Sequence, residues 1–141
     1  MGCRVEIERV PGNLPLRNDP NLAPLFRRNA EHLFGARCFR KHPHRGGSTD
    51  AGDLSQLMPL LHPVVIGAQG DPHSRDWHIA DFECGYVAPA KLLAMMAIDL
   101  LFDEAAGAQA VLDAHEPAMS KDEYLENQRR VFRTETFDDA G

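Results

Sequence analysis

The segment from Val87 to Phe102 is the most apolar part of the chain, and it constrains the fold more than any other feature. Pro89 stands where a proline fits the first turn of a helix, so we expect a helix that ends at Phe102. Its apolar residues lie almost all round, and such a helix must be covered on several sides, as crossover helices on a sheet are. Because Pro89, Lys91 and Asp99 interrupt the segment and a bilayer span needs about 20 residues, we expect a buried helix.

Composition places the chain among ordinary globular proteins. Its 141 residues, 43% hydrophobic and 26% charged, suit one domain with a core of its own. The formal net charge of −6 argues against nucleic acid or an anionic membrane as partner, since both attract basic surfaces. Three widely spaced cysteines without a C-x-x-C pair predict reduced, buried thiols in a cytoplasmic protein.

The beginning of the chain predicts a strand followed by a helix. Apolar and charged residues alternate from residue 3 to residue 8, which is the period of a strand with one solvent-facing side, and Pro11 ends it. The chain begins inside this strand, which fits a truncation at Met1 as well as a natural start. The sequence Asn18-Asp19-Pro20 predicts a helix start, and Gly35 predicts its end as a left-handed cap.

The rest of the chain predicts further alternation of strands and helices. We expect strands at 36–42 and 63–66, helices at 53–61, 105–114 and 120–132, an irregular connection at 68–81 and a disordered C-terminal tail. Ser120 and Glu123 form a capping box at the start of the last helix. These elements predict an α/β fold: a partial three-layer sheet with covering helices.

The stretch from Gly46 to Asp53 is rich in glycine and in helix-capping residues. Two adjacent glycines free the backbone for a tight loop, and Ser48, Thr49 and Asp50 are strong N-caps, so we expect the loop to open directly onto a short helix. The free N–H groups of such a terminus bind anions, carboxylates included. A plain loop-to-helix cap without a ligand explains the same residues.

His73 lies in a polar turn shortly after the apolar run 62–67. A histidine in this position is a common way to present a metal ligand, although a surface histidine is the simpler alternative. His78 is the main rival for that role. His42 and His44 form an H-x-H pair with a weaker claim to a metal.

Three stretches together resemble the C-terminal part of the co-catalytic zinc amidohydrolases, a family that includes carboxypeptidase G, the aminoacylases and the aminobenzoyl-glutamate utilisation proteins. The stretches are 47–55, 70–74 and 90–101. The last-named members look closest, because a Gly-Ser-Thr-Asp-x-Gly-Asp loop is characteristic there. Upstream, Val5-Glu6-Ile7 resembles the last strand of the family's inserted lid domain, and Asn18-Asp19-Pro20 resembles the return to the catalytic domain.

The resemblance implies a division of the chain and a set of site residues. Residues 1–17 would be the remnant of the lid strand and its connector, 18–103 the C-terminal part of the catalytic domain, and 104–141 the C-terminal helices and tail. His73 would be the last protein ligand of a two-zinc site. The substrate carboxylate would meet the backbone amides of Gly47, Ser48 and Thr49, while Asp50 and Asp53 would orient the ligating histidine or serve as helix caps.

The family's other zinc ligands and its catalytic glutamates lie upstream of the lid domain. This chain has no Glu-Glu pair and no His-x-Asp, so it carries none of those catalytic residues. The resemblance therefore implies the C-terminal portion of a metal-dependent amidohydrolase that cleaves N-acyl-amino-acid or peptide-like amides with a free carboxylate. Without its N-terminal half it would be inactive and would bind zinc weakly or not at all.

The expected partners are the missing N-terminal half or a second copy of the chain. Two other functions fit the same residues. One is a non-catalytic binding or assembly module that keeps the fold. The other is a mononuclear metal-binding protein that uses His73 and His78.

Overall fold

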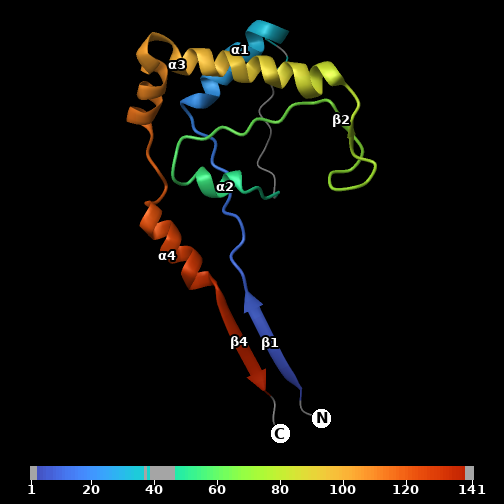
Figure 1. Cartoon of the computed structure of the whole chain (residues 1–141), viewed down its shortest axis with the longest axis vertical. Helices are drawn as coiled ribbons and strands as arrows, with labels where there is room; N and C mark the ends of the chain where they lie inside the picture. Colours follow the sequence, from blue (N-terminus) through green and yellow to red (C-terminus); the bar gives the residue numbers. More distant parts are fainter. Residues whose placement is uncertain (1–2, 37, 39–46, 139–141) are drawn as a thin grey trace. The chain divides into compact units, whose positions relative to one another are not determined.

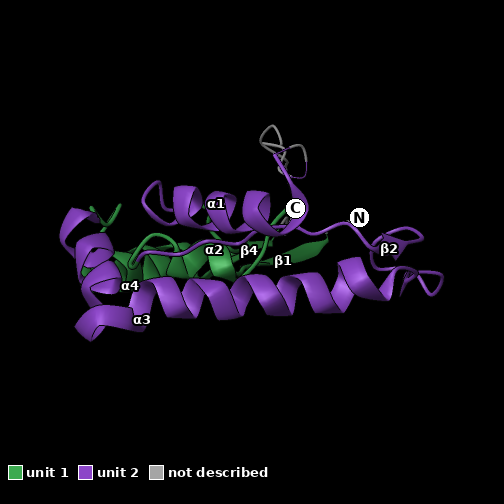
Figure 2. Cartoon of the chain, turned by 90° about the horizontal axis from the view of Figure 1, so that it is seen from above, with its two compact units in different colours: residues 1–17, 47–58, 116–141 green, residues 18–46, 59–115 purple. Residues whose placement is uncertain are grey.

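The computed structural model describes residues 3–36, 38 and 47–138. It is a mixture of helix (48%) and strand (13%), which agrees with the coarse α/β prediction. Two compact units are present, shown in different colours in Figure 2. Unit 1 comprises residues 1–17, 47–58 and 116–141, and unit 2 comprises residues 18–46 and 59–115.

Unit 2 is built on two helices, α1 (Leu22–Phe34) and α3 (Ala88–Ala114), which run side by side in Figures 1 and 2. Apolar side chains spaced about one helical turn apart meet between them. They are Leu22, Phe26 and Ala30 from α1 with Leu92, Met96 and Val111 from α3. Each large side chain buried in this way contributes about 1.5 to 3 kcal/mol, so this contact is the core of the unit.

Helix α3 is two helical segments joined by a kink. The two segments were predicted from the sequence, but the change of direction between them was not. The backbone leaves the helical conformation from Phe102 to Ala105, and the second segment runs in a different direction from the first (Figure 1). Gly107 permits a close approach of the two segments, because a methyl group there would collide with the carbonyl oxygen of Asp99. Val111 is thereby brought into the core.

The prediction that this apolar helix is covered on several sides is wrong for the described chain. On α3 the buried residues are Ala88, Leu92, Met96 and Val111, whereas Leu93 is 67% exposed and Leu101 66%. By length and composition alone, Glu83–Ala114 could cross a membrane, which is weak evidence for a span. The physical reason for the exposure is that α1 packs on one side of the helix only.

Asp19 joins three parts of unit 2. Its Oδ1 accepts hydrogen bonds from the backbone N–H groups of Asn21 (2.8 Å) and Leu22 (3.1 Å), which caps α1 as predicted. Its Oδ2 lies 2.8 Å from Nδ1 of His115, the residue that ends α3. Its own N–H donates to the carbonyl oxygen of Leu60 at 2.8 Å. The start of α1, the end of α3 and the connecting segment thus meet at one buried carboxylate.

These contacts set the pKa of the Asp19 carboxyl. Burial alone raises the pKa, but the hydrogen bonds from His115 and from the two backbone amides outweigh it and bring the pKa below its ordinary value of 3.8. Because the folded value is the lower one, the carboxylate's contribution to stability is complete above the unfolded pKa. It is lost as the pH falls through the folded value.

The remainder of unit 2 contains one small hairpin. Strand β2 (Ala68–Gln69) pairs antiparallel with β3 (His78–Ile79) inside the stretch predicted to be irregular. The predicted buried strand at 63–66 is wrong: these residues form no strand in the described chain, and Ile66 is 83% exposed. Their apolar side chains resemble those of a core strand, but they are exposed. The short π-helix η1 (Glu83–Val87) then leads into α3.

Gly35 ends α1 at a positive φ of 83°, as a capping glycine does, but its ψ of 161° is extended, whereas a left-handed cap was predicted. The predicted strand at 36–42 and the His42–His44 pair lie almost wholly outside the described residues. The cysteines are free, as predicted, but they are not buried: Cys3 and Cys38 are exposed and Cys84 is intermediate.

Unit 1 contains a two-stranded antiparallel ribbon made from distant parts of the chain. Strand β1 (Arg4–Arg9), which the alternation predicted, pairs with β4 (Arg133–Asp138), which was not predicted. The register runs from the pair Arg4–Asp138 to the pair Arg9–Arg133. The expectation that one side of β1 is buried is wrong, because every residue of β1 is exposed.

Two helices complete unit 1. Helix α4 (Lys121–Val131) begins with the predicted capping box: Glu123 N–H donates to Ser120 Oγ (3.2 Å), and Ser120 N–H donates to Glu123 Oε2 (2.7 Å). Helix α2 (Ala51–Leu54) is shorter than the predicted 53–61 and begins earlier, because Asp50 caps it. Turns continue from it to Met58.

Replacing Asp19 with alanine should destabilise unit 2 by about 2 to 3 kcal/mol at neutral pH, because a helix cap and the partner of a buried histidine are lost. Denaturant unfolding measures the change. The difference from the unsubstituted chain should begin to shrink as the pH falls below the ordinary pKa of 3.8, and it should be lost once the pH passes the lower pKa of the folded chain. Asp71→Ala, at an exposed position in the same unit, should cost less than about 0.5 kcal/mol. Equal losses in the two variants would contradict this role for Asp19.

Candidate functional site

The glycine-rich loop leads into α2 as predicted, and its polar side chains have local partners. The carboxylate of Asp50 accepts a hydrogen bond from Ala51 N–H at 3.1 Å and one from Thr49 Oγ1 at 3.2 Å. Asp53 Oδ1 accepts the backbone N–H of Leu14 at 2.8 Å. The two aspartates therefore hold the loop and the connector in shape. The contact of Asp50 corresponds to the capping alternative left open by the sequence, whereas Asp53 lies inside α2 and its bond to Leu14 was not predicted.

The residues after α2 fasten this loop to the connector 14–17. Ser55 is almost fully buried; its Oγ accepts Arg17 N–H at 2.9 Å and donates to Gly52 O at 2.6 Å. The side chain of Gln56 donates from Nε2 to Pro15 O at 2.7 Å, and the backbone carbonyl oxygen of Gln56 accepts Ala118 N–H at 2.9 Å. Sequence reasoning gave Ser55 and Gln56 no role, because their partners lie about 40 or more residues away.

Gly47, Ser48 and Thr49 form the entrance to α2. Gly47 and Ser48 are exposed, and a side chain added at Gly47 would meet nothing within 4 Å. The chain is therefore exposed at Gly47 and Ser48, whereas the first N–H groups of α2 already donate within the loop: Gly52 N–H to Thr49 O at 2.9 Å and Asp53 N–H to Asp50 O at 3.1 Å. Gly52 differs, because a methyl group on it would collide with the carbonyl oxygen of Leu14.

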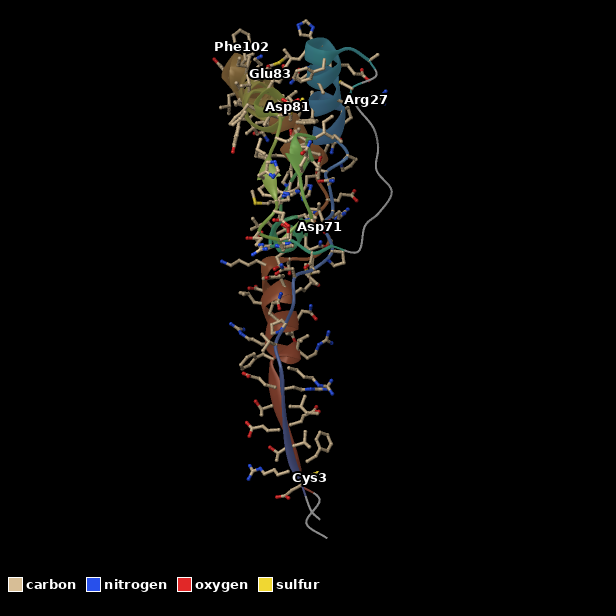
Figure 3. The ribbon with its side chains drawn as sticks, turned by 90° about the vertical axis from the view of Figure 1, so that its right-hand side faces the viewer. Cys3, Arg27, Asp71, Asp81, Glu83 and Phe102 are labelled. Carbon is tan, nitrogen blue, oxygen red and sulfur yellow. The ribbon has the colours of Figure 1, made fainter. Side chains whose placement is uncertain are left out.

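His73 lies in the turn that connects β2 and β3 in unit 2. Its φ is 64°, in the left-handed region that residues with side chains seldom adopt, and its side chain is exposed. The turn is closed by Ser74 N–H donating to Asp71 O (3.1 Å) and by Trp77 N–H donating to Ser74 O (3.3 Å); Asp71 is labelled in Figure 3. The imidazole is thus held outward by a strained but hydrogen-bonded backbone.

His78, the rival ligand, begins β3 and is also exposed. Its Nδ1 lies 2.9 Å from the carbonyl oxygen of Asp76. With a proton on Nδ1, this contact leaves Nε2 as the nitrogen with a free lone pair. Both histidines belong to unit 2, whereas Gly47, Ser48 and Thr49 belong to unit 1.

The donor set around these histidines is incomplete for zinc. A stable zinc site needs three or four protein ligands. Among residues 3–36, 38 and 47–138, no group of three or more histidine, cysteine, aspartate or glutamate side chains is placed to hold a metal ion. The described residues alone therefore do not fit a complete zinc centre, and a centre that includes His73 needs donors from elsewhere.

A small hollow in unit 2 was missed by sequence reasoning. Its volume is about 180 Å³, and the residues that line it are Ile66, Gly67, Ala68, Gln69, Ala80, Asp81 and Cys84. Asp81, labelled in Figure 3, accepts the backbone N–H of Cys84 at 2.9 Å, and this bond holds the pKa of Asp81 below its usual value. The same carboxylate, by accepting a hydrogen bond from the thiol, raises the pKa of Cys84. A thiol kept protonated is a poor nucleophile.

Gly52→Ala should destabilise unit 1 by about 2 kcal/mol or more, because the Leu14 backbone must move to admit the methyl group. Gly47→Ala is the matched control and should change the free energy of unfolding by less than about 0.5 kcal/mol. Thermal or denaturant unfolding of the two variants checks this. A Gly47→Ala variant as unstable as Gly52→Ala would show that the loop is packed where the structure leaves it open.

His73→Gly should raise the stability of unit 2 by about 0.5 to 1 kcal/mol, because glycine adopts the left-handed conformation without steric cost. His78→Gly, in strand conformation, should lower stability instead. Denaturant unfolding gives both values. A clear loss of stability in His73→Gly would mean that the histidine side chain holds the turn together and has a structural role.

In comparisons with known proteins, no family model matches the chain, no curated protein matches it, and no solved structure matches it. The resemblance to the zinc amidohydrolases therefore depends on the motifs themselves: the loop at 47–55, the turn at 70–74 and the apolar helix at 90–101.

Proposed function

We propose that this chain is the C-terminal portion of a metal-dependent amidohydrolase. Its substrates are N-acyl amino acids or peptide-like amides with a free carboxylate, of the aminobenzoyl-glutamate kind. It acts in the cytoplasm, and a missing N-terminal half completes a three-layer sheet and supplies the catalytic groups. The three motifs, present in the family's order and spacing, support this proposal.

The observation that carries the proposal is the backbone of His73 together with its place in the motif. A residue other than glycine at φ 64° is uncommon, and backbone strain of this kind costs of order 1 to 3 kcal/mol. Among the described residues, Asp103, Glu104 and Ala105 also have positive φ, but they form the bend of α3, whereas His73 lies in an exposed turn between two strands. The turn is also the one in which the resemblance places the last zinc ligand.

The chain's own residues divide the work between its two units. In unit 2, His73 presents an outward imidazole as one ligand of the metal site. In unit 1, the open backbone at Gly47, Ser48 and Thr49 receives the substrate carboxylate by hydrogen bonds from N–H groups. Asp50 and Asp53 keep that loop in shape through their bonds to Ala51 and Leu14. The remaining zinc donors and the general base belong to the missing half.

The purified chain should therefore not hydrolyse amides, and co-expression with an N-terminal half from the family should restore zinc-dependent activity. His73→Ala should abolish the restored activity, whereas His78→Ala should retain most of it. Hydrolysis of aminobenzoyl-glutamate and of N-acyl amino acids is the measurement. Vigorous metal-dependent turnover by the 141-residue chain alone would overturn the proposal, because the catalytic groups would then lie among its own residues.

A non-catalytic assembly module is the second candidate, favoured by the exposed apolar side chains of α3. Loss of activity on His73→Ala in the co-expressed enzyme distinguishes the two, because an assembly module has no activity to lose. A mononuclear metal protein would instead bind zinc tightly and stoichiometrically through His73 and His78. Calorimetry on the isolated chain tests that alternative.

A further inference from the structure

The side of α3 that faces away from α1 is apolar for about three helical turns. Six residues make up this surface, here called the outer face, and all are exposed: Ala90, Leu93, Ala94, Ala97, Ile98 and Leu101. At about 100° per residue they lie on the side of the helix opposite Leu92 and Met96, which are buried against α1. A helix with one buried side normally carries polar residues on the other. The outer face breaks this rule.

We propose that the outer face is a self-association surface, on which two copies of the chain pack α3 against α3 in antiparallel fashion. The two-fold axis passes close to Ala97. This inference is independent of the proposed hydrolase function, since it concerns neither His73 nor the glycine-rich loop.

The distribution of side-chain sizes favours a second helix as the occupant. The small residues Ala90, Ala94 and Ala97 let another helix approach closely, at the short end of the usual interaxial distance of about 8 to 10 Å. Larger side chains flank them, and Leu93 and Leu101 are equally far from Ala97 in sequence. In an antiparallel pair whose two-fold axis passes close to Ala97, Leu93 of each copy therefore packs against Leu101 of the other copy.

The charges at the two ends of the outer face have opposite sign. Lys91 lies at the beginning, and Asp103 and Glu104 lie at the end, with Ala97 midway between Lys91 and Asp103. Antiparallel packing brings Lys91 near Asp103 and Glu104 of the second copy, whereas parallel packing would bring like charges together. Lys91 already donates to Glu83 at 2.9 Å, yet half of its side chain remains exposed, so it is available to a further acid.

A lipid bilayer explains the outer face less well. The helical backbone is interrupted from Phe102 to Ala105, and Asp99, Asp103 and Glu104 lie within or next to the apolar segment. Asp99 is committed to unit 2, since it accepts a hydrogen bond from Asn29 at 2.7 Å and pairs with Arg28 at 3.0 Å. Charged groups at this spacing are costly in a membrane. They cost little at the edge of a helix pair.

Sedimentation equilibrium of the full chain should show a monomer–dimer equilibrium. Ala97→Glu, which places two like charges at the axis, should raise the dissociation constant at least about tenfold. Ala110→Glu is the matched control: the same substitution at an exposed alanine of the same helix, outside the outer face, which should leave the constant within about twofold.

Charge reversal tests the antiparallel arrangement. Lys91→Glu should weaken the dimer, and the double variant Lys91→Glu, Glu104→Lys should restore most of the affinity. The crosslinking test uses a chain in which the native cysteines are replaced by serine. Copies with Leu93→Cys should crosslink to copies with Leu101→Cys, whereas two copies with Leu93→Cys should crosslink to each other only slowly. Circular dichroism confirms that each variant is folded.

Three results would overturn the proposal: a monomer at about 100 μM, equal dissociation constants for Ala97→Glu and Ala110→Glu, or crosslinking of Leu93→Cys to itself as the main product. Binding of the monomer to neutral phosphatidylcholine vesicles, lost in Ala97→Glu, would assign the outer face to a membrane instead. Each outcome leaves the test of His73 in hydrolysis unaffected.

Discussion

The carboxylate of Asp19 is the interaction on which unit 2 depends. It caps α1, pairs with the histidine that ends α3, and lies beside a backbone bond to Leu60. His115 Nε2 is buried without a hydrogen-bond partner among the described residues, so the imidazole depends on Asp19 for its one polar contact. A buried polar group left without any partner costs about 1 to 3 kcal/mol. The start of α1 and the end of α3 are thus held together by the same carboxylate.

The apolar segment around α3 governs what the rest of the molecule can do. One side of the helix forms the core with α1, and the opposite side is apolar without cover in the described chain. The six exposed apolar residues of this side, with charges only at its ends, point to contact with another surface. Self-association and completion by another polypeptide are different ways to meet the same physical need, and both follow from a helix with two apolar sides.

Local signals were predicted well from the sequence, and long-range pairings were not. The start of α1 at Asn18-Asp19-Pro20, the capping box of α4 and the interruption of α3 depend on neighbouring residues, and the structure has each of them. The prediction of a buried strand at 63–66 was wrong, because an apolar run does not reveal whether other residues pack over it. Strand β4 was missed because its partner lies at the other end of the chain. In the candidate site, the turn at His73 was placed by its flanking residues, but its left-handed backbone was not foreseen.

The ribbon of β1 and β4 joins the beginning of the described chain to its end. Closing so long a loop carries a large entropic cost, and the closure cannot begin during synthesis until Arg133, the partner of Arg9, has left the ribosome. Unit 2 needs only residues 18–115 and can gain its helix–helix core earlier. Folding is therefore ordered in time, and the exposed strand β1 waits without its partner while the rest of the chain is made. During that interval β1 presents the unpaired backbone that neighbouring chains can capture.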